Sequence, residues 1–291
     1  MKCIRDPKAF QREMERLRLR GKAIGFVPTM GALHEGHLSL VRAARKENDV
    51  VAVSLFVNPL QFGPTEDFKK YPRPARSDRR KLRGARTDYL FAPDPRGMYP
   101  EGSATTVDAG SLAKVLCGRS RPGHFRAVAT VVAKLFHLAK PHRAYFGAKD
   151  YQQALVIRRL VKDLDFDLEC RVMPVVREAD GLAMSSRNRY LDPGERRRAA
   201  VIPGTLLWVH GEFARGKRDL GRIRREAVAR LRAQVSAVDY FEIADPETLE
   251  PLKKAGAQMQ VLTACFMGKT RLIDNVRINL RPTARISVKA G

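Results

Sequence analysis

The chain has 291 residues, of which 44% are hydrophobic, and this suits one large or two modest domains with a real core. Its 55 basic and 31 acidic residues give a formal net charge of +24, which would attract nucleic acid, anionic membranes or polyanionic substrates. No run approaches the roughly 18 apolar residues that span a bilayer. Residues 1–22 mix charges with Phe10, Met14 and Leu17 at helical spacing, unlike a signal peptide. We therefore expect a cytoplasmic protein that begins with a surface helix.

A repeating pattern of strand, short loop and amphipathic helix begins near residue 22. A strand at 23–27, a loop at 28–36 and a helix at 37–46 form the first unit. The next strand, 50–56, is a nearly continuous apolar run, which is typical of a parallel strand covered on both faces.

The same pattern returns further along the chain. A strand at 143–146 leads through the loop 147–150 into a helix at 151–164, and a strand at 171–176 comes next. Strands that alternate with helices predict an α/β fold with a Rossmann-like doubly wound parallel sheet. Such sheets bind ligands beyond the carboxyl ends of their strands.

The pattern changes after residue 191, where two helical stretches precede three short strands. The stretches lie at 193–214, 220–235, 240–244, 260–266 and 271–274. We therefore expect two domains, a Rossmann-like domain at 1–178 and a smaller C-terminal α+β domain at 179–291.

The sharpest chemical motif is Pro28-Thr29-Met30-Gly31-Ala32-Leu33-His34-Glu35-Gly36-His37, where a strand passes into a helix. A helix N-terminus presents free N–H groups and the positive end of the helix dipole, so it binds phosphate. Gly36 lets the backbone approach a ligand, and the two imidazoles can donate hydrogen bonds to a phosphate whose charge grows in the transition state. The zinc motif His-Glu-x-x-His needs histidines four apart, and these are three apart, so we expect no protein-bound metal. Two unrelated surface histidines are the other alternative.

Two later loops carry groups that suit a nucleotide. In Gly147-Ala148-Lys149-Asp150, the lysine suits ATP phosphates, and the aspartate suits a ribose hydroxyl or a water on magnesium. A surface turn is the alternative there. Met184-Ser185-Ser186-Arg187-Asn188 offers two hydroxyls and a guanidinium to a phosphate, or a helix cap.

Two glutamines lie in loops of the same kind. Gln61 belongs to Asn58-Pro59-Leu60-Gln61-Phe62, and Gln153 opens the helix after Asp150. If a substrate carboxylate must attack phosphorus, an Arg or Lys partner would stabilise its ground-state charge, whereas a neutral amide orients it without that penalty. A structural role for either glutamine remains equally open.

The cysteines and the basic runs point to no further site. The four cysteines are scattered and include no Cys-x-x-Cys pair, which favours reduced structural thiols over disulfides or zinc. The basic residues cluster at 73–86, 196–198 and 215–232 with little aromatic interleaving. This arrangement favours a solvated surface over nucleic-acid binding.

Taken together, the loops resemble the pantothenate synthetases (pantoate–β-alanine ligases), a family of His-x-Gly-His nucleotidyltransferases. The matching blocks follow in order along nearly the whole chain, at 28–37, 58–62, 67–73, 121–136, 144–153, 181–191 and 270–275. The resemblance implies that pantoate carboxylate attacks the α-phosphorus of ATP, releasing pyrophosphate. β-Alanine would then attack the acyl carbon of pantoyl adenylate, releasing AMP and pantothenate. The resemblance also implies a homodimer and a C-terminal domain that acts as a lid.

The resemblance implies a role for each matching site residue. The catalytic candidates are His37, as the proton donor, with His34 and Lys149. Gln61, Gln153 and Asn58 would bind pantoate, and Gln61 would also bind β-alanine. Mg²⁺ would be bound with ATP rather than by the protein. The residues implied in ATP binding are Met30, Gly31, Ala32, Leu33, His34, Glu35, Gly36, His37, Gly147, Ala148, Lys149, Asp150, Val176, Met184, Ser185, Ser186 and Arg187.

Two other functions stay open, and the chain departs from the family at two positions. Another His-x-Gly-His nucleotidyltransferase, such as a cytidylyltransferase, would release pyrophosphate independently of pantoate. A nucleic-acid-binding role would rest on charge alone and would weaken steeply with salt. Ala127 stands where glycine is usual and His137 where asparagine is usual. If that glycine permits close packing, Ala127 would shift the helix that follows.

Overall fold

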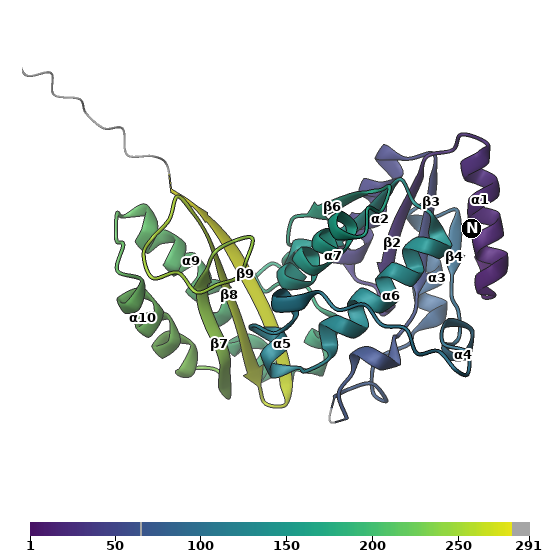
Figure 1. The fold of residues 1–291 in the computed structure, drawn as a ribbon. Coiled ribbons are helices and arrows are strands. Elements are labelled where there is room, and N and C mark those ends of the chain that lie inside the picture. Colours follow the sequence, from purple (N-terminus) through teal and green to yellow (C-terminus); the bar gives the residue numbers. More distant parts are fainter. Residues whose placement is uncertain (65, 281–291) are drawn as a thin grey trace, which may run out of the picture. The chain divides into compact units, whose positions relative to one another are not determined.

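Within the part of the chain that the structure describes, residues 1–64 and 66–280, six parallel strands form one sheet (Figure 1). In the computed structural model these strands are β1 (Lys2–Ile4), β2 (Ile24–Thr29), β3 (Val50–Leu55), β4 (Tyr89–Phe91), β5 (Arg143–Gly147) and β6 (Glu169–Met173). Their order across the sheet is β1-β4-β3-β2-β5-β6. The chain therefore adds β3 on one side of β2 and later β5 on the other. This reversal creates a topological switch point at the carboxyl ends of β2 and β5, where α/β sheets bind ligands.

Helices cover both faces of this sheet. The helices described before residue 190 are α1 (Pro7–Leu19), α2 (Glu35–Glu47), α3 (Ala75–Gly84), α4 (Pro95–Met98), α5 (Cys117–Ser120), α6 (His124–Ala139) and α7 (Tyr151–Asp163). The 3₁₀ turns are η1 (Pro59–Gln61), η2 (Gly110–Ala113), η3 (Ala148–Asp150) and η4 (Ser186–Tyr190). Helices α1, α6 and α7 pack on one face, and α2 and α3 pack on the other, as the ribbon in Figure 1 shows. The predicted doubly wound α/β fold is confirmed.

Strand β3 shows why the sheet is buried on both sides. Ala52 contributes to the core under α1 and α6, and Val53 contributes to the core under α2. Its first five residues are buried. The continuous apolar run therefore supplies both cores at once, as expected for a central parallel strand.

Some predicted boundaries need correction. Residues 2–4 form β1 rather than part of the first helix, because they pair with β4 far along the chain. Helix α2 begins at Glu35, so both residues between the two histidines are helical. Strand β6 ends at Met173, which leaves Val176 in the following loop. The bounds of β1 and β6 follow from pairing with the distant strands β4 and β5, whereas α2 begins at Glu35 because His34 and His37 cap its start.

Contacts divide the chain into two units, Met1–Arg189 and Tyr190–Gly291. This division falls after the expected 178/179 boundary, because residues 186 and 187 bond to the first unit. Ser186 Oγ donates to Ala32 O at 3.0 Å, and Arg187 pairs with Asp67.

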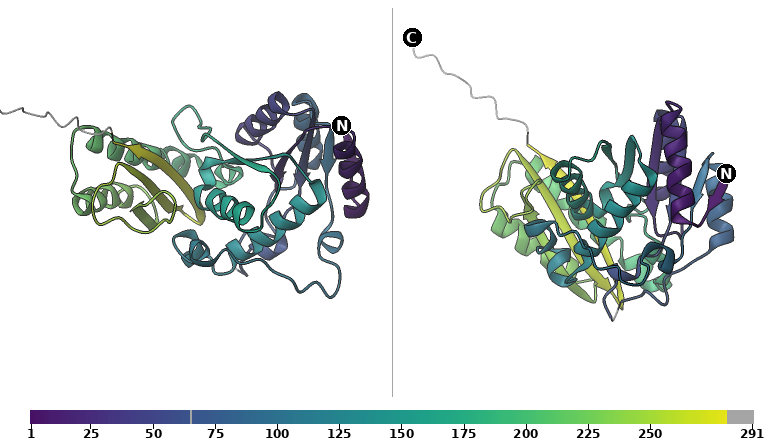
Figure 2. Two further views of the ribbon diagram at one scale, coloured as in Figure 1. Left: turned by 45° about the horizontal axis from the view of Figure 1, so that its top comes forward. Right: turned by 45° about the vertical axis from the view of Figure 1, so that its right-hand side comes forward.

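Among the described residues from Tyr190 onward, three antiparallel strands form a second sheet with the order β7-β8-β9. The elements of this unit are α8 (Pro193–Arg198), α9 (Val201–Ala214), α10 (Leu220–Arg232), β7 (Ala237–Ala244), β8 (Gln258–Met267) and β9 (Thr270–Asn279). Helices α9 and α10 pack against each other and against the sheet, as Figure 2 shows in green beside the yellow-green strands. The α+β character expected of this region is confirmed.

Two expectations from composition, on membrane spans and on the cysteines, can be compared with the described residues. None of their helices is both long and apolar enough to cross a bilayer. All four cysteines are free thiols; Cys117 and Cys265 are buried, Cys170 is half-buried and Cys3 is exposed.

Candidate functional site

The loop between β2 and α2 is held in an unusual backbone conformation. Gly31 has a φ of 87° and Ala32 a φ of 51°, both in the left-handed region. The buried carboxylate of Asp78, on α3, accepts hydrogen bonds from Ala32 N at 2.8 Å and Leu33 N at 2.9 Å. Lys81, one turn later on α3, donates to Leu33 O. Helix α3 therefore fixes the loop that presents the N-terminus of α2.

The two histidines of the motif lie against each other at this helix N-terminus. Their ring centroids are 4.1 Å apart. His34 N donates to His37 Nδ1 at 3.3 Å, so Nδ1 carries no proton and the neutral imidazole has its N–H at Nε2. A Cβ at Gly36 would lie 2.9 Å from the His34 ring. Glycine is therefore required for this arrangement.

Both imidazoles are neutral at physiological pH. Desolvation, followed by the neighbouring His34, lowers the pKa of His37 to about 3. Desolvation and the Lys149 cation lower the pKa of His34 to about 4. Because neither ring is charged, each can act near pH 7 only as a neutral hydrogen-bond donor or acceptor. At neutral pH His37 therefore has one N–H group to offer, at Nε2.

These histidines face a pocket of about 160 Å³ in the first unit. Four separate loops supply most of its lining. Of the predicted site residues, those that line it are Met30, His34, Gly36, His37, Gly147, Lys149, Asp150, Gln153, Val176, Met184, Ser185, Ser186 and Arg187. The remaining lining residues are Pro28, Leu40, Tyr71, Tyr145, Phe146, Pro174 and Val175.

The cations of the pocket have carboxylate neighbours. Lys149 Nζ lies 3.6 Å from Asp150 Oδ1. Arg187 makes a bidentate pair with Asp67, with Nε at 3.0 Å and Nη2 at 2.8 Å. Burial favours the neutral form of Arg187, but the bonds to Asp67 outweigh it and raise the pKa of the guanidinium. Two of its five N–H groups are taken by Asp67, so the others can still donate to an anion.

Ser186 takes part in the structure of the site. Its hydroxyl is buried and donates to Ala32 O. It therefore joins η4 to the loop that precedes α2. Ser185, which also lines the pocket, accepts a hydrogen bond from Arg187 N at 3.2 Å.

Several predicted residues lie beside the pocket rather than on its surface: Gly31, Ala32, Leu33, Glu35, Ala148, Asn58 and Gln61 are not part of its lining. Ala32 and Leu33 are buried and shape the loop through their backbone. The carboxylate of Glu35 points to Arg42.

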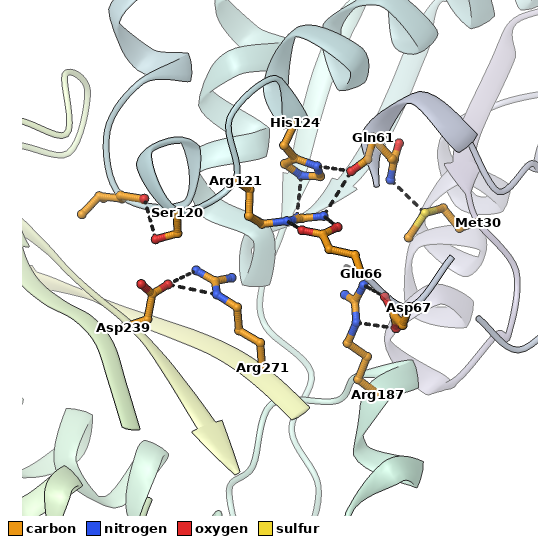
Figure 3. Close-up of polar contacts among 11 residues, drawn as sticks. Met30, Gln61, Glu66, Asp67, Ser120, Arg121, His124, Arg187, Asp239 and Arg271 are labelled. Atoms are coloured by element: carbon orange, nitrogen blue, oxygen red, sulfur yellow. Dashed lines mark hydrogen bonds and ion pairs between the residues drawn. The ribbon is translucent and has the colours of Figure 1, made fainter. Parts of the chain in front are cut away.

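Gln61 reaches the pocket wall through one neighbour. Its Nε2 contacts Met30 Sδ at 2.9 Å, and its Oε1 accepts from Asn58 Nδ2 at 3.3 Å (Figure 3 shows the contact with Met30). Asn58 is almost fully buried; its Nδ2 also donates to Ala127 O, and its Oδ1 accepts from Tyr99. Asn58 thus helps to orient the side-chain amide of Gln61.

Four residues were missed as site residues by sequence reasoning. Asp78 fixes the α2 loop, Asp67 holds Arg187, and Arg121 and His124 bond to the backbone of Gln61. Three of them lie in the matched blocks at 67–73 and 121–136, which was the available signal. No local pattern marks Asp78, because its partners lie more than 40 residues away.

The described residues contain no group of three or more His, Cys, Asp and Glu side chains arranged to hold a metal. Asp150 is the carboxylate among the lining residues. The cations in the lining are Lys149 and Arg187, which suit an anionic ligand.

A helix N-terminus and cationic side chains around one pocket, at the switch point of a parallel sheet, define an α/β protein of the nucleotide-binding class. A family model described as pantoate-beta-alanine ligase matches residues 2–277. The pantothenate synthetase of Thermotoga petrophila is 52% identical over 276 residues, which cover 94% of this chain and 99% of that protein. The chain belongs to the pantoate–β-alanine ligase family.

Solved structures agree with this assignment. The pantothenate synthetase of Thermus thermophilus superposes with a TM-score of 0.90 at 47% identity, covering 95% of this chain and 99% of that one. The pantoate-beta-alanine ligase of Francisella tularensis, complexed with beta-gamma ATP and beta-alanine, gives a TM-score of 0.79 at 35% identity, covering 95% and 97%.

Proposed function

We propose that this chain condenses pantoate with β-alanine in two steps, with pantoyl adenylate as the intermediate. In the first step a carboxylate oxygen of pantoate attacks the α-phosphorus of ATP, and the bond from that phosphorus to pyrophosphate breaks. In the second, the amine of β-alanine attacks the acyl carbon and loses a proton. The bond to AMP breaks, and pantothenate is released. The overall reaction is that of the family to which the chain belongs.

One observation carries the proposal: His37, Lys149, Ser185 and Gln153 line the same pocket although they come from three segments far apart in the sequence. The first three can meet a triphosphate, and the fourth offers a neutral amide to a carboxylate. A nucleotide site and an acid site thus share one cavity, as attack of an acid on a nucleotide requires.

The first step fits the hydrogen-bonding state of the histidines. His37 would donate from Nε2 to a phosphate oxygen as negative charge grows there. A neutral donor is already in place at pH 7 and needs no proton uptake. Lys149 and Arg187 would bind phosphate oxygens, with Arg187 keeping its pair with Asp67.

The glutamines would hold pantoate without blunting its carboxylate. Gln153 lines the pocket, and Gln61 lies behind Met30. Amides orient the acid but stabilise its charge less than a cation would, so less of the attacking power is lost in the ground state. We assign pantoate to both glutamines and β-alanine to Gln61, with Asn58 in support.

The remaining parts of the proposal concern the assembly and the metal. Mg²⁺ would arrive on the ATP phosphates, consistent with the single carboxylate in the pocket lining. We expect a cytoplasmic homodimer in which the C-terminal unit acts as a lid that keeps water from the adenylate. Light scattering would report the dimer, and omission of Mg²⁺ should abolish pyrophosphate release.

Pyrophosphate release from ATP, with and without pantoate and before any β-alanine, tests the proposal. A pantoate-dependent burst of about one equivalent per site, then steady turnover once β-alanine is added, is the expected result. Release that ignores pantoate would show a nucleotide site with a different acceptor and would overturn the proposal.

A further inference from the structure

Gln61 is the buried last residue of η1, a single 3₁₀ turn that packs against α6. Leu60, in the middle of the turn, is 53% exposed. Such a short element holds its shape only when neighbouring groups fix it. The position of the Gln61 amide therefore depends on what holds the η1 backbone.

Two side chains hold that backbone: His124, the first residue of α6, and Arg121, in the turn just before it. His124 Nδ1 lies 2.9 Å from Gln61 O, and Arg121 Nη2 donates to the same oxygen at 3.2 Å. Figure 3 shows both contacts converging on the carbonyl. These partners are 60 and 63 positions from Gln61 in the sequence, so the contacts exist only in the folded chain.

The hydrogen-bond partners of His124 determine its tautomer. Arg121 Nη1 lies 2.9 Å from His124 Nε2. A guanidinium can only donate, so Nε2 must accept and cannot carry a proton. The proton is therefore on Nδ1, which donates to Gln61 O.

The surroundings keep this tautomer neutral. Glu66 fixes Arg121 through two bonds of 2.6 Å, to Nε and Nη2. Burial and the adjacent Arg121 cation lower the pKa of His124 to about 4. A protonated ring would place N–H against N–H at Nε2, so the pair is self-consistent only with neutral His124.

We propose that His124, as the neutral Nδ1–H tautomer oriented by Arg121, is a positioning residue that sets the place of Gln61 for the acid substrate. The proposal rests on the role of Gln61 in the proposed function. His124 does not line the pocket; it acts through the Gln61 carbonyl. Its loss would let η1 move, and a displacement of about 1 Å in a substrate-positioning group can cost up to about a hundredfold in rate.

Replacement of His124 by three residues separates this role from general stability. Asparagine places an N–H donor close to where Nδ1 lies, glutamine places one near Nε2, and alanine supplies none. We expect His124→Ala and His124→Gln to raise the KM for pantoate about tenfold, the effect of losing one hydrogen bond. His124→Asn should stay within about twofold of the wild type, and the KM for ATP should change little in all three.

Two reference variants of the full-length protein make the outcomes distinct. His137→Ala changes an exposed histidine on the same helix, about 20 Å along its axis, and should be kinetically silent. Gln61→Ala should weaken pantoate use more than any His124 variant. Impaired Gln61→Ala beside normal His124→Ala would overturn the positioning role alone. Normal Gln61→Ala would overturn the assignment of Gln61, and the positioning role with it.

A spectroscopic measurement on the unmodified protein does not depend on how the variants fold. Long-range ¹H–¹⁵N correlation, with the signal assigned from His124→Asn, should show the Nδ1–H tautomer at pH 7. An Nε2–H tautomer or a charged ring would overturn the proposal. Equal loss of pantoate and ATP affinity in His124→Ala, with no rescue by asparagine, would do the same.

Discussion

At the level of single residues, the hydrogen-bond partners fix the protonation of the site. His37 receives a backbone N–H at Nδ1, and His124 receives a guanidinium at Nε2. The two rings are therefore opposite tautomers, both neutral, with pKa values lowered to about 3 and about 4 by burial and by His34 and Arg121 respectively. His37 presents its donor at Nε2, the nitrogen left free by the backbone contact, and His124 presents its donor to the protein backbone.

Removal of the His37 donor should slow adenylation with little loss of fold. We expect His37→Ala to lower the single-turnover rate of pyrophosphate release by about 10²–10³-fold, as for other lost transition-state donors. His37→Gln should retain part of the rate, because its amide nitrogen lies near the position of Nε2. Quenched-flow measurement with ATP and pantoate checks this, with His137→Ala as the control. A wild-type rate in His37→Ala would remove it from the chemistry.

The pH dependence of adenylation follows from the same lowered pKa values. With His34 at about 4 and His37 at about 3, neither ring titrates between pH 5.5 and 7.5. The single-turnover rate should therefore show no step near the ordinary histidine pKa of about 6.5. An acidic limb between pH 6 and 7 that vanishes in His37→Gln would contradict the neutral-donor assignment.

At the level of elements, the nucleotide loop depends on α3 as much as on its own sequence. Asp78 supplies both acceptors for the N–H groups of Ala32 and Leu33. The left-handed backbone of Ala32 costs conformational free energy. The two hydrogen bonds to the buried Asp78 carboxylate offset that cost and hold the loop in place.

Asp78→Asn tests this support. The NH₂ group of the asparagine would face the backbone N–H of either Ala32 or Leu33, which would lose its acceptor. We expect the free energy of unfolding to fall by about 1–3 kcal/mol because of this unsatisfied buried donor. The KM for ATP should rise as well. Urea unfolding checks the stability, with the exposed helix cap Asp94→Asn as a nearly neutral control. A change within about 0.5 kcal/mol, typical of surface positions, would show that Asp78 does not support the loop.

The packing of α2 on β2 depends on a glycine. A Cβ at Gly25 would lie 2.5 Å from Asn48 Nδ2, at the end of α2. That nitrogen also donates to Tyr145, so it cannot move freely. We expect Gly25→Ala to cost about 1–3 kcal/mol by overpacking.

Gly84→Ala is the matched control for this change, because nothing lies within 4 Å of its Cβ position on α3. It should be neutral or slightly stabilising. Chemical denaturation compares the two variants, and equal midpoints would show that α2 adjusts without cost.

At the level of the whole molecule, the basic excess cannot be neutralised internally. Even if every carboxylate were paired with one cation, 24 positive charges would remain. Helix α10 carries several basic side chains, with Arg225 and Arg232 exposed. These charges repel one another, and salt should screen that repulsion.

Acid should destabilise the protein in a window set by its neutral histidines. The pKa values of His34, His37 and His124 are lowered from 6.5 to about 4, 3 and 4. Below pH 6.5 the unfolded chain binds protons that the folded chain does not. Stability that is present above pH 6.5 is therefore lost as the pH falls toward 4, by up to about 2 kcal/mol per histidine at pH 5.

Urea unfolding at pH 7, 6 and 5 measures this loss. Repetition in 0.5 M salt removes the surface repulsion but leaves the effect of the buried rings. Burial raises the pKa of Glu66 and Asp67, but their bonds to arginines outweigh it, so both pKa values are lowered. The stability that these two carboxylates contribute is therefore lost mainly below this pH window. An unfolding free energy that is constant from pH 7 to 5 would contradict the lowered histidine values.

The sequence by itself determined the class of fold and most of the pocket lining. Apolar runs such as Val50–Leu55 are predictable because a parallel strand buried on both faces needs apolar residues throughout. The motif from Met30 to His37 is predictable because phosphate binding at a helix start is a local property of backbone and glycine. Family resemblance then supplied the substrates.

Only the tertiary structure decided strand pairing, protonation and support. The pairing of β1 with β4 joins segments that no local pattern relates. The tautomers of His37 and His124, the anchoring of the loop by Asp78, and the place of Gln61 behind Met30 all follow from hydrogen bonds in the folded chain. The contacts that set the two tautomers join residues three positions apart, whereas the contacts of Asp78 with the loop, of His124 with Gln61 and of Gln61 with Met30 span more than 30 positions. They could not be read from the sequence, because the geometry of a hydrogen bond between distant residues is set by how the sheet and its helices pack.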